Sequence, residues 1–267
     1  MQKNFEKKLF CFGFGYSAQE LAKEPCWETV TGTHRNDFPL NADMQKKLAE
    51  ATHVLLSIPP DAEGDLVFRE NYEINAQWVG YLSTTGVYGD TQGEWIDETA
   101  AVQPNQERSK WRAIAETQWL KGGLPVEVFR LSGIYGAGDD RNALDAVKTN
   151  TARRIAKENQ FFSRIHVEDI AQILLASINA PQSGEIYNCA DDFPCPQAEV
   201  IEYAAELLNV APPPLVKFED ADLSPMARSF YSSSRKVSNQ KIKDKLGVKL
   251  KFPTYREGLI NILHNMA

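Results

Sequence analysis

The chain has 267 residues, 43% hydrophobic and 24% charged, which is enough for one large domain or for two lobes that share a core. Its 29 basic and 36 acidic side chains give a net charge of −7 without a dense basic patch, which disfavours nucleic-acid binding. The sequence has no apolar run of membrane-spanning length and no signal-like apolar segment at its start. Its four cysteines and four histidines show no metal-binding spacing. We therefore expect a reduced, cytoplasmic protein without a metal site.

The first predicted element is a buried strand over residues 9–12, which runs into a glycine-rich turn. Gly13, Gly15 and Ala18 form a G-x-G-x-x-A pattern, and an amphipathic stretch follows. The first glycine permits a tight turn, the second lets the backbone approach a pyrophosphate, and the small third residue lets helix and strand pack closely. The alternative, which the pattern alone leaves open, is an ordinary turn. The predicted dinucleotide contacts here are Gly13, Gly15, Tyr16, Ser17 and Ala18.

The second predicted strand, over residues 28–33, bears on the choice of dinucleotide. Sites that prefer NAD usually carry an Asp or Glu about 20 residues after the turn, where it holds the ribose 2′-hydroxyl. Here the strand leads into His34 and Arg35, and the first carboxylate, Asp37, follows two residues later. An arginine can pair with a 2′-phosphate, so Arg35 favours NADP and makes NAD the less favoured cofactor. The alternative is that Arg35 is a solvated loop residue.

The chain then alternates helices and strands. Residues 41–51 have helical character, and residues 53–58 form an apolar strand that Pro59 and Pro60 stop. Further helices are expected at 65–78, 109–121 and 168–179, and further strands at 79–83, 126–131 and 186–188. Such alternation predicts an α/β fold with a mainly parallel, doubly wound sheet of the Rossmann type. Additional cofactor contacts are predicted at Ser57, Ile58 and Pro59.

The alternation ends after about residue 190. A helix over residues 197–209 meets three consecutive prolines, and helices near 239–246 and 255–264 follow. This tail and an insertion are expected to form a smaller, C-terminal substrate lobe over the carboxyl edge of the sheet. The predicted dinucleotide-binding domain is 1–136 with 161–190, and the predicted substrate lobe is 137–160 with 191–267.

Four segments spread over most of the chain carry a family pattern. They read LSTTGVYGD at 82–90, FRLSGIYG at 129–136, RIHVEDIA at 164–171 and Tyr187-Asn188. In this order they resemble the extended short-chain dehydrogenase/reductase family, which includes nucleotide-sugar epimerases and dehydratases. The phrases GYLSTTGVYGD, FSRIHVEDIA and SPMARSFY are similar to an atypical bacterial branch labelled NAD-dependent epimerase/dehydratase. The resemblance implies a Rossmann fold, a nicotinamide cofactor and a small-molecule substrate.

The family's catalytic helix carries a Tyr and a Lys four residues apart, on one face of the helix. The lysine lowers the tyrosine pKa and holds the nicotinamide ribose, and the tyrosine acts as acid or base. Here the helix reads QERSKWRAIAE from residue 106. Aligned on the Ser-Lys dipeptide, the tyrosine position is Gln106, whereas an alignment on Glu116 makes the pair Arg108 and Arg112. Neither supplies a tyrosine, so the usual proton-transfer pair is absent, and Arg108 and Arg112 are candidate catalytic residues.

Other candidate catalytic side chains lie near the predicted carboxyl edge. Thr84 stands where the family keeps a catalytic Ser or Thr, whose hydroxyl would bind a substrate oxygen beside the nicotinamide; alternatively it satisfies a turn. Tyr88 and Tyr135 could replace the lost acid, although such a tyrosine is more often a packing residue. His166 could be a base, but a structural hydrogen bond at the start of its helix is the favoured interpretation.

Cations with few nearby acids occur in the expected substrate lobe. Arg228 and Arg235 lie in SPMARSFYSSSRK, where Met226 and Phe230 are unusual for a merely exposed loop. In the family this region covers the substrate, and an arginine can bind a phosphate or carboxylate through two N–H groups. The alternative is a solvated basic loop. The predicted substrate-binding residues are Tyr135, Arg164, His166, Arg228 and Arg235.

Two functions are compatible with these patterns. The first is an NADP-dependent oxidoreductase, epimerase or dehydratase-like enzyme acting on a small polar substrate, such as a phosphorylated or nucleotide-linked sugar or another carbonyl compound. The second is a non-catalytic NADP-binding sensor or regulator. The missing Tyr–Lys pair favours the sensor, and the retained Thr84 and the covering lobe favour the enzyme. The expected partner is a small molecule, with neither nucleic acid nor membrane, and a homodimer is compatible with the pattern.

Overall fold

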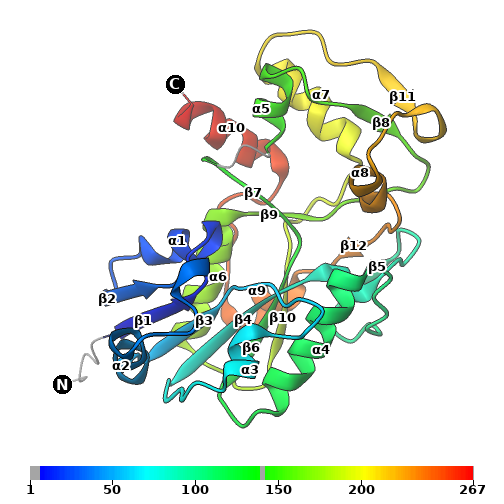
Figure 1. The fold of residues 1–267 in the computed structure, drawn as a ribbon. Helices are drawn as coiled ribbons and strands as arrows, with labels where there is room; N and C mark the ends of the chain where they lie inside the picture. Colours follow the sequence, from blue (N-terminus) through cyan, green and yellow to red (C-terminus); the bar gives the residue numbers. More distant parts are fainter. Residues whose placement is uncertain (1–6, 139–141, 267) are drawn as a thin grey trace.

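The computed structural model describes residues 7–138 and 142–266, and its centre is a six-stranded sheet (Figure 1). The strands are β1 (Lys7–Phe12), β2 (Trp27–Gly32), β3 (His53–Leu56), β4 (Trp78–Thr84), β6 (Val126–Leu131) and β10 (Ile186–Cys189). Their order is β10-β6-β4-β3-β1-β2, and every neighbouring pair is parallel. This sheet confirms the predicted Rossmann-type α/β fold, with the direction of strand order reversing between β1 and β3.

Each strand places alternate side chains on opposite faces of the sheet. In β1, Leu9 and Cys11 join the apolar cluster on one face, whereas Phe10 and Phe12 join the cluster on the other. None of these four side chains is more than 2% exposed. A parallel strand covered on both faces needs apolar residues at consecutive positions, which explains the continuous apolar run in the sequence.

Helices cover both faces of the sheet (Figure 1). One face is covered by α1 (Tyr16–Ala22), α6 (Val167–Asn179) and α9 (Gln240–Leu246), and the other by α2 (Ala42–Glu50), α3 (Leu66–Glu70) and α4 (Glu107–Lys121). α9 packs there through Ile242, which is fully buried although the sequence assigned its segment to the substrate lobe. The C-terminal segment therefore contributes to the packing of the sheet as well.

The helix predicted over residues 65–78 is shorter than expected. Asp65 caps its N-terminus, and the helix ends at Glu70. Asn71 then adopts the left-handed conformation (φ 50°), which breaks the helical hydrogen-bond pattern. Trp78 instead begins β4 and is fully buried between the sheet and α6. The predicted end of the helix was wrong, because the apolar Trp78 belongs to a buried strand and not to the buried face of a helix.

A smaller lobe lies beyond the carboxyl edge of the sheet, above it in Figure 1. Its core is formed by α5 (Ala143–Lys148), α7 (Gln197–Leu207) and α10 (Tyr255–Asn265). A pair of strands, β8 (Arg154–Ala156) and β11 (Leu215–Lys217), and the short helix α8 (Pro225–Phe230) complete it. The sequence predicted α7 and α10 but not α5, α8 or the strands, because elements of three to six residues carry too little periodicity.

Two small strand pairs connect the sheet to the smaller lobe. β7 (Gly133–Tyr135) pairs with β9 (Arg164–His166), and β5 (Trp95–Ile96) pairs with β12 (Lys236–Val237). The segments that follow β4 and β6 therefore run beneath the smaller lobe, where β7 and β9 are visible in Figure 1. Among the residues that the structure describes, no helix combines the length and apolarity needed to cross a bilayer.

Candidate functional site

Two adjoining cavities lie at the carboxyl end of the sheet. The sheet-edge cavity, of about 310 Å³, is bordered by the first residues of α1, the ends of β3, β4 and β6, and α4, and neither Gly13 nor Gly15 is among its lining residues. The inter-lobe cavity, of about 360 Å³, lies between the end of the sheet and α5, α7 and α10. Thr84, Leu131, Ser132 and Ile134 line both, so a ligand in one cavity can contact a ligand in the other.

The two glycines of the turn have different roles. Gly13 has φ +87°, and a Cβ atom there would lie 3.0 Å from Ile58 Cγ1, so the backbone requires glycine at this position. Its N–H donates to Thr33 Oγ1 at 2.9 Å, which fixes the turn against the end of β2. A Cβ atom on Gly15 would meet no atom within 4 Å outside its neighbouring residues. Gly15 therefore leaves open space next to the cavity-lining Tyr16, whereas Gly13 shapes the turn.

The other predicted dinucleotide contacts fall into two groups. Those that line the sheet-edge cavity are Tyr16, Ser17 and Ser57. Those that do not line it are Ala18, Ile58 and Pro59. Ala18 is fully buried in the cluster that packs α1 on the sheet, and Ile58 packs behind Gly13. Pro59 is exposed. Ala18 and Ile58 thus support the turn from behind.

Arg35 lies outside both cavities. It begins the short helix η1 (Arg35–Asp37) that follows β2, and its side chain is exposed. The carboxylate of Asp37 turns back and accepts a hydrogen bond from His34 N at 2.6 Å. Within residues 7–138 and 142–266, Arg35 makes no hydrogen bond or ion pair. Its guanidinium is therefore available at the tip of the second strand.

Thr84 ends β4 at the junction of the two cavities. Its Oγ1 accepts a hydrogen bond from Gly86 N at 3.1 Å, which caps the short helix η2 (Thr85–Tyr88). That contact uses a lone pair and not the hydroxyl proton, so the hydroxyl can still donate to a ligand. The turn-forming role and a ligand-binding role are therefore compatible in one side chain.

The geometry of α4 distinguishes the two alignments of the catalytic helix. Arg108 lines the inter-lobe cavity, and Arg112, one turn later on the same face, lines the sheet-edge cavity. Lys110, the lysine of the other alignment, is exposed and pairs with Glu107 at 2.5 Å. Arg112 is held in place by a hydrogen bond from Nη1 to Leu82 O at 2.5 Å. The alignment on Glu116 is thus the one whose two side chains face the cavities.

Tyr88 lies in the protein interior. Its side chain is 2% exposed and lines neither cavity, and its hydroxyl donates to Asn188 Oδ1 at 2.7 Å. The hydroxyl also accepts from Arg130 Nη1 at 2.8 Å, and Arg130 forms a two-point ion pair with Glu116. Burial raises the pKa of Tyr88. The expectation that Tyr88 could supply the missing acid is not met, because η2 turns its ring inward.

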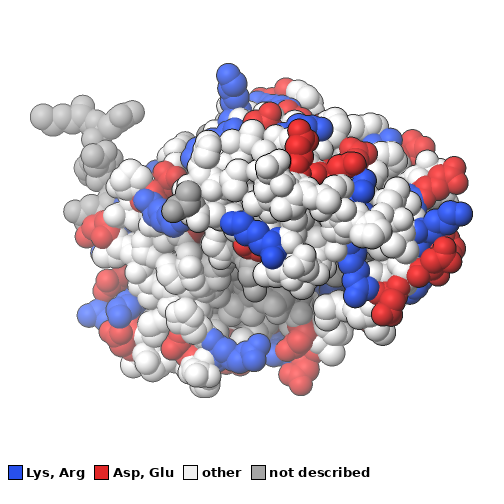
Figure 2. All heavy atoms as spheres, turned by 90° about the horizontal axis from the view of Figure 1, so that it is seen from above, with Lys and Arg blue, Asp and Glu red and all other residues white. Residues whose placement is uncertain are grey.

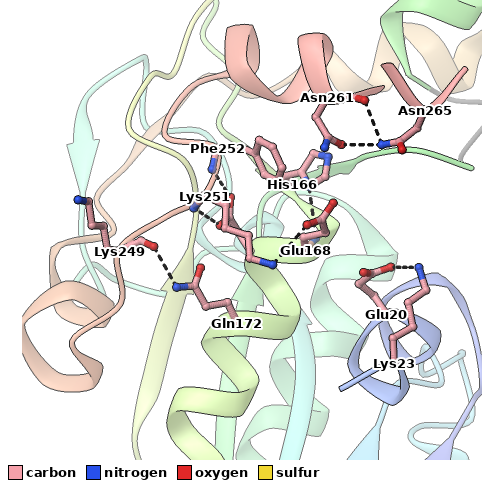
Figure 3. Close-up of polar contacts among 11 residues, drawn as sticks. Glu20, Lys23, His166, Glu168, Gln172, Lys249, Lys251, Phe252, Asn261 and Asn265 are labelled. Carbon is pink, nitrogen blue, oxygen red and sulfur yellow. Dashed lines mark hydrogen bonds and ion pairs between the residues drawn. The ribbon is translucent and has the colours of Figure 1, made fainter. Parts of the chain in front are cut away.

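His166 is also buried. Its Nδ1 accepts a hydrogen bond from Glu168 N at 3.3 Å at the start of α6 (Figure 3). The ring packs on Phe252 at a centroid distance of 4.0 Å, and burial lowers its pKa to about 4. Asp169, in the same helix, accepts a hydrogen bond from Lys251 N at 2.6 Å and so holds the segment around Phe252 against the start of α6. His166 is thus neutral near pH 7 and lines neither cavity, so the substrate-binding assignment is corrected to a structural one.

Tyr135 and Arg164 border the inter-lobe cavity from β7 and β9. The Tyr135 hydroxyl donates to Thr254 O at 3.4 Å, and burial raises its pKa. Arg164 donates from Nη1 to the oxygen and sulfur of Cys195, each at 3.3 Å, and from Nη2 to Gln197 Oε1 at 2.8 Å. Because these acceptors engage most of its N–H groups, Arg164 holds β9 to the start of α7.

The two arginines of the C-terminal segment lie in different places. Arg228 donates to Ala221 O at 3.1 Å and stacks over Phe218 at 4.8 Å, and it lines neither cavity. Arg235 lines the inter-lobe cavity and donates to Gly89 O, and burial lowers its pKa. The structure brings Arg235 to the cavity and not Arg228, because α8 directs Arg228 towards Phe218.

Several polar side chains that line the inter-lobe cavity were not among the predicted site residues. Gln106 donates to Ser229 O at 2.9 Å and so joins α4 to α8. Ser132 lies where the cavities meet, and its buried Oγ has no hydrogen-bond partner in the described part of the chain. These residues come from distant segments, so only the tertiary structure assembles them. The others are Thr85, Asn105, Ser109, Asn142, Ser163, Gln197 and Ser233.

The charges that line the cavities are all positive among the described residues. They belong to Arg108, Arg112, Arg164 and Arg235. The outer surface differs, since acidic and basic side chains are interspersed in the view of Figure 2. No group of three or more His, Cys, Asp or Glu that could hold a metal occurs in the described ranges. The site therefore favours anionic ligands.

Sequence comparison relates the chain to known proteins. The profile of the NAD dependent epimerase/dehydratase family matches residues 22–190. Protein YeeZ of Escherichia coli strain K12 is 32% identical over 140 residues, which are 50% of this chain and 47% of YeeZ. The chain thus spans about half the length of the curated relative that it matches.

Solved structures share the fold over nearly the whole chain. A functionally unknown conserved protein from Silicibacter pomeroyi is 42% identical, with a TM-score of 0.84 and coverage of 97% of this chain and 99% of that one. MoeE5 with UDP-glucose and NAD shares the fold at 16% identity, with a TM-score of 0.76 and 96% and 97% coverage. RMD from Pseudomonas aeruginosa with NADPH shares it at 18% identity, with a TM-score of 0.71 and 97% coverage of both chains.

Proposed function

Because the chain belongs to the NAD dependent epimerase/dehydratase family, we propose that it binds NADP(H) in the sheet-edge cavity and a small polar substrate in the inter-lobe cavity. The observation that carries the proposal is the meeting of the two cavities at Thr84 and Ser132. A cofactor in one cavity and a substrate in the other would touch there. Hydride transfer requires this arrangement, since the reacting atoms must lie within van der Waals contact.

The residues at the sheet-edge cavity fit a dinucleotide. The open space beside Gly15 can admit a pyrophosphate close to the backbone, and Ser17 and Ser57 supply hydroxyls at the wall. When bound, the nicotinamide would donate or accept a hydride. The preference for NADP rests on Arg35, which is exposed and has no hydrogen bond or ion pair within the described ranges. It rests also on the hydrogen bond from His34 N that holds the Asp37 carboxylate.

The substrate would be positioned by groups from both lobes. Thr84 would donate a hydrogen bond from its hydroxyl to a carbonyl or hydroxyl oxygen of the substrate, because accepting from Gly86 N leaves the hydroxyl proton free. Arg108, Arg164 and Arg235 would surround the substrate with positive charge, which suits a phosphorylated, carboxylated or nucleotide-linked compound. We assign these steps to an oxidoreductase, epimerase or dehydratase-like enzyme with an atypical active site.

Each part of the chain has a distinct role in this proposal. Residues 1–136 and 161–190 would bind the cofactor, with α9 added to their core. Residues 137–160 and 191–267 would otherwise cover the substrate, since α5, α7 and α10 wall the inter-lobe cavity. A cytoplasmic setting agrees with four free cysteines, three of which are buried.

A second candidate function is a cofactor-binding sensor without turnover. The observation that favours it is the occupation of the two cavity-facing positions of α4 by Arg108 and Arg112. Neither guanidinium can exchange a proton near neutral pH, so the acid–base step of the family has no residue there.

Calorimetric titration with NADPH and NADH, followed by a turnover assay, tests both functions. An enzyme would bind NADPH and oxidise it in the presence of a member of a panel of sugar phosphates, nucleotide sugars and small carbonyl acids. A sensor would bind NADPH and leave the whole panel unchanged. Failure to bind either dinucleotide would contradict both.

A further inference from the structure

The inter-lobe cavity has a charge opposite to that of the whole chain. Its charged wall residues in the described ranges are Arg108, Arg164 and Arg235, with no acid among them, whereas the chain has a net charge of −7. A cluster of like charges around a cavity is unfavourable unless an anion or protein acceptors compensate it. The three arginines differ in how many of their N–H groups already donate to acceptors in the protein.

Arg108 is the arginine with the most donors available. Arg164 is engaged by Phe162, Cys195 and Gln197, and Arg235 donates to the backbone at Gly89. The guanidinium of Arg108 instead stacks on the ring of Phe230 at 5.0 Å, and it has no hydrogen bond or ion pair within residues 7–138 and 142–266. Stacking uses the flat face of the group and leaves the N–H groups around its edge free to bind an oxyanion.

Arg108 shares the cavity-facing side of α4 with Arg112. The two are four residues, about 6 Å along the helix axis, apart, and Arg112 lines the sheet-edge cavity. Thr84 lines the inter-lobe cavity together with Arg108, and it lines the sheet-edge cavity as well. A ligand in the inter-lobe cavity can therefore present one oxygen to Thr84 and an anionic group to Arg108.

We propose that Arg108 is the residue that binds an oxyanion of the ligand, while Thr84 contacts a carbonyl or hydroxyl oxygen of the same ligand. The ligand is then a small carbonyl or hydroxyl compound that carries a carboxylate or a phosphate. The cavity, at about 360 Å³, is near the lower end of the range for ligand pockets, which suits a compound of this size. This assignment rests on the proposed function and specifies the substrate class of the same site.

The test titrates oxalate and inorganic phosphate separately into the NADPH-saturated protein by calorimetry. Oxalate tests for a carboxylate at Arg108, and phosphate tests for a phosphate there. We expect one of them to bind and Arg108→Ala to weaken it at least about tenfold, as expected for loss of a charge-assisted contact. Arg108→Lys should recover part of the affinity, because lysine keeps the charge but not the planar pair of donors.

The matched control is Lys110→Ala, which removes an equal charge from the same helix at an exposed position outside both cavities. It should bind the anion as the unaltered protein does, and thermal unfolding will show whether each variant is folded. A loss confined to oxalate identifies a carboxylate ligand, and a loss confined to phosphate identifies a phosphate ligand.

Equal anion binding by the unaltered protein and Arg108→Ala would overturn the proposal, as would the absence of binding by either anion. If NADPH itself does not bind, the proposed function fails instead. The same titrations of the cofactor-free protein would then decide the role of Arg108 independently.

Discussion

Two glycines that are two residues apart should respond in opposite ways to substitution. Gly15→Val should abolish NADPH binding with little change in stability, since a Cβ atom there meets no atom within 4 Å outside its neighbouring residues and the side chain would occupy the ligand's space. Gly13→Ala should instead destabilise the fold by about 1 kcal/mol or more, because φ is +87° and Ile58 is close. Calorimetry and thermal unfolding measure the two effects. Unchanged NADPH affinity in Gly15→Val would show that the turn is only structural.

Arg35 should determine the choice between the two nicotinamide dinucleotides. We expect NADPH to bind at least about tenfold more tightly than NADH, about 1.4 kcal/mol. Arg35→Glu should remove this preference, since a carboxylate repels a 2′-phosphate and can accept from a 2′-hydroxyl. Lys46→Glu, an equal change of charge at another exposed position, is the control. Equal affinities for NADPH and NADH in the unaltered protein would contradict the assignment.

Among the secondary-structure elements, η2 decides the role of Tyr88. Tyr88→Phe removes the hydroxyl that donates to the side-chain oxygen of Asn188 and accepts from Arg130 Nη1. Both groups lie in the interior, where an unmade hydrogen bond costs about 1–3 kcal/mol. We therefore expect that loss in the free energy of unfolding, measured with urea, and an unchanged affinity for NADPH. Unchanged stability together with weaker cofactor binding would contradict this structural role and would indicate that Tyr88 belongs to the functional site.

The helix α4 has structural and candidate functional residues on neighbouring faces. Glu116 is 3% exposed and accepts from Ser83 Oγ at 2.5 Å and from Arg130, which anchors the helix to the ends of β4 and β6. Arg108 and Arg112 lie on the face that meets the cavities. The buried ion pair thus fixes the rotation of the helix, which determines the residues that face a ligand.

At the scale of the whole molecule, Asp191 lies where the chain crosses from β10 to the smaller lobe. Its carboxylate is 1% exposed, and Oδ2 has no hydrogen-bond partner in the described part of the chain. Burial raises its pKa from 3.8 to about 7, although Arg164 acts in the opposite direction. Because the folded-state pKa is raised, the stabilisation by this group is complete below about pH 4 and is lost as the pH rises through about 7.

Asp191→Asn should therefore stabilise the protein more at pH 8 than at pH 5, by a difference on the order of 1–3 kcal/mol in the free energy of unfolding. Asparagine resembles the protonated carboxyl and can keep the acceptor for Phe193 N. His53 and His166, whose pKa values burial lowers to about 4, titrate equally in both proteins and cancel in the comparison. If Asp191→Asn changes the free energy of unfolding by the same amount at both pH values, the titration of Asp191 does not affect stability.

The sequence by itself determined the α/β fold and the family. Strand residues such as Leu9 to Phe12, the Gly13–Gly15 spacing and the turn at Thr84 are read from neighbouring residues, because backbone geometry and hydrophobic periodicity act over a few positions. The same short range explains why α5, α8 and the short strand pairs were not predicted. The absence of the Tyr–Lys pair was also evident, since no alignment of residues 106–116 supplies a tyrosine.

Only the tertiary structure decided which side chains reach the cavities. Tyr88 and Arg108 were both candidates, yet η2 buries one and α4 directs the other to the inter-lobe cavity. Arg228 and Arg235 are seven positions apart in one basic segment, but the pairing of β12 with β5 carries only Arg235 to that cavity. These outcomes depend on contacts between segments far apart in the chain, and the direction of a side chain at such a contact is not encoded in its neighbours.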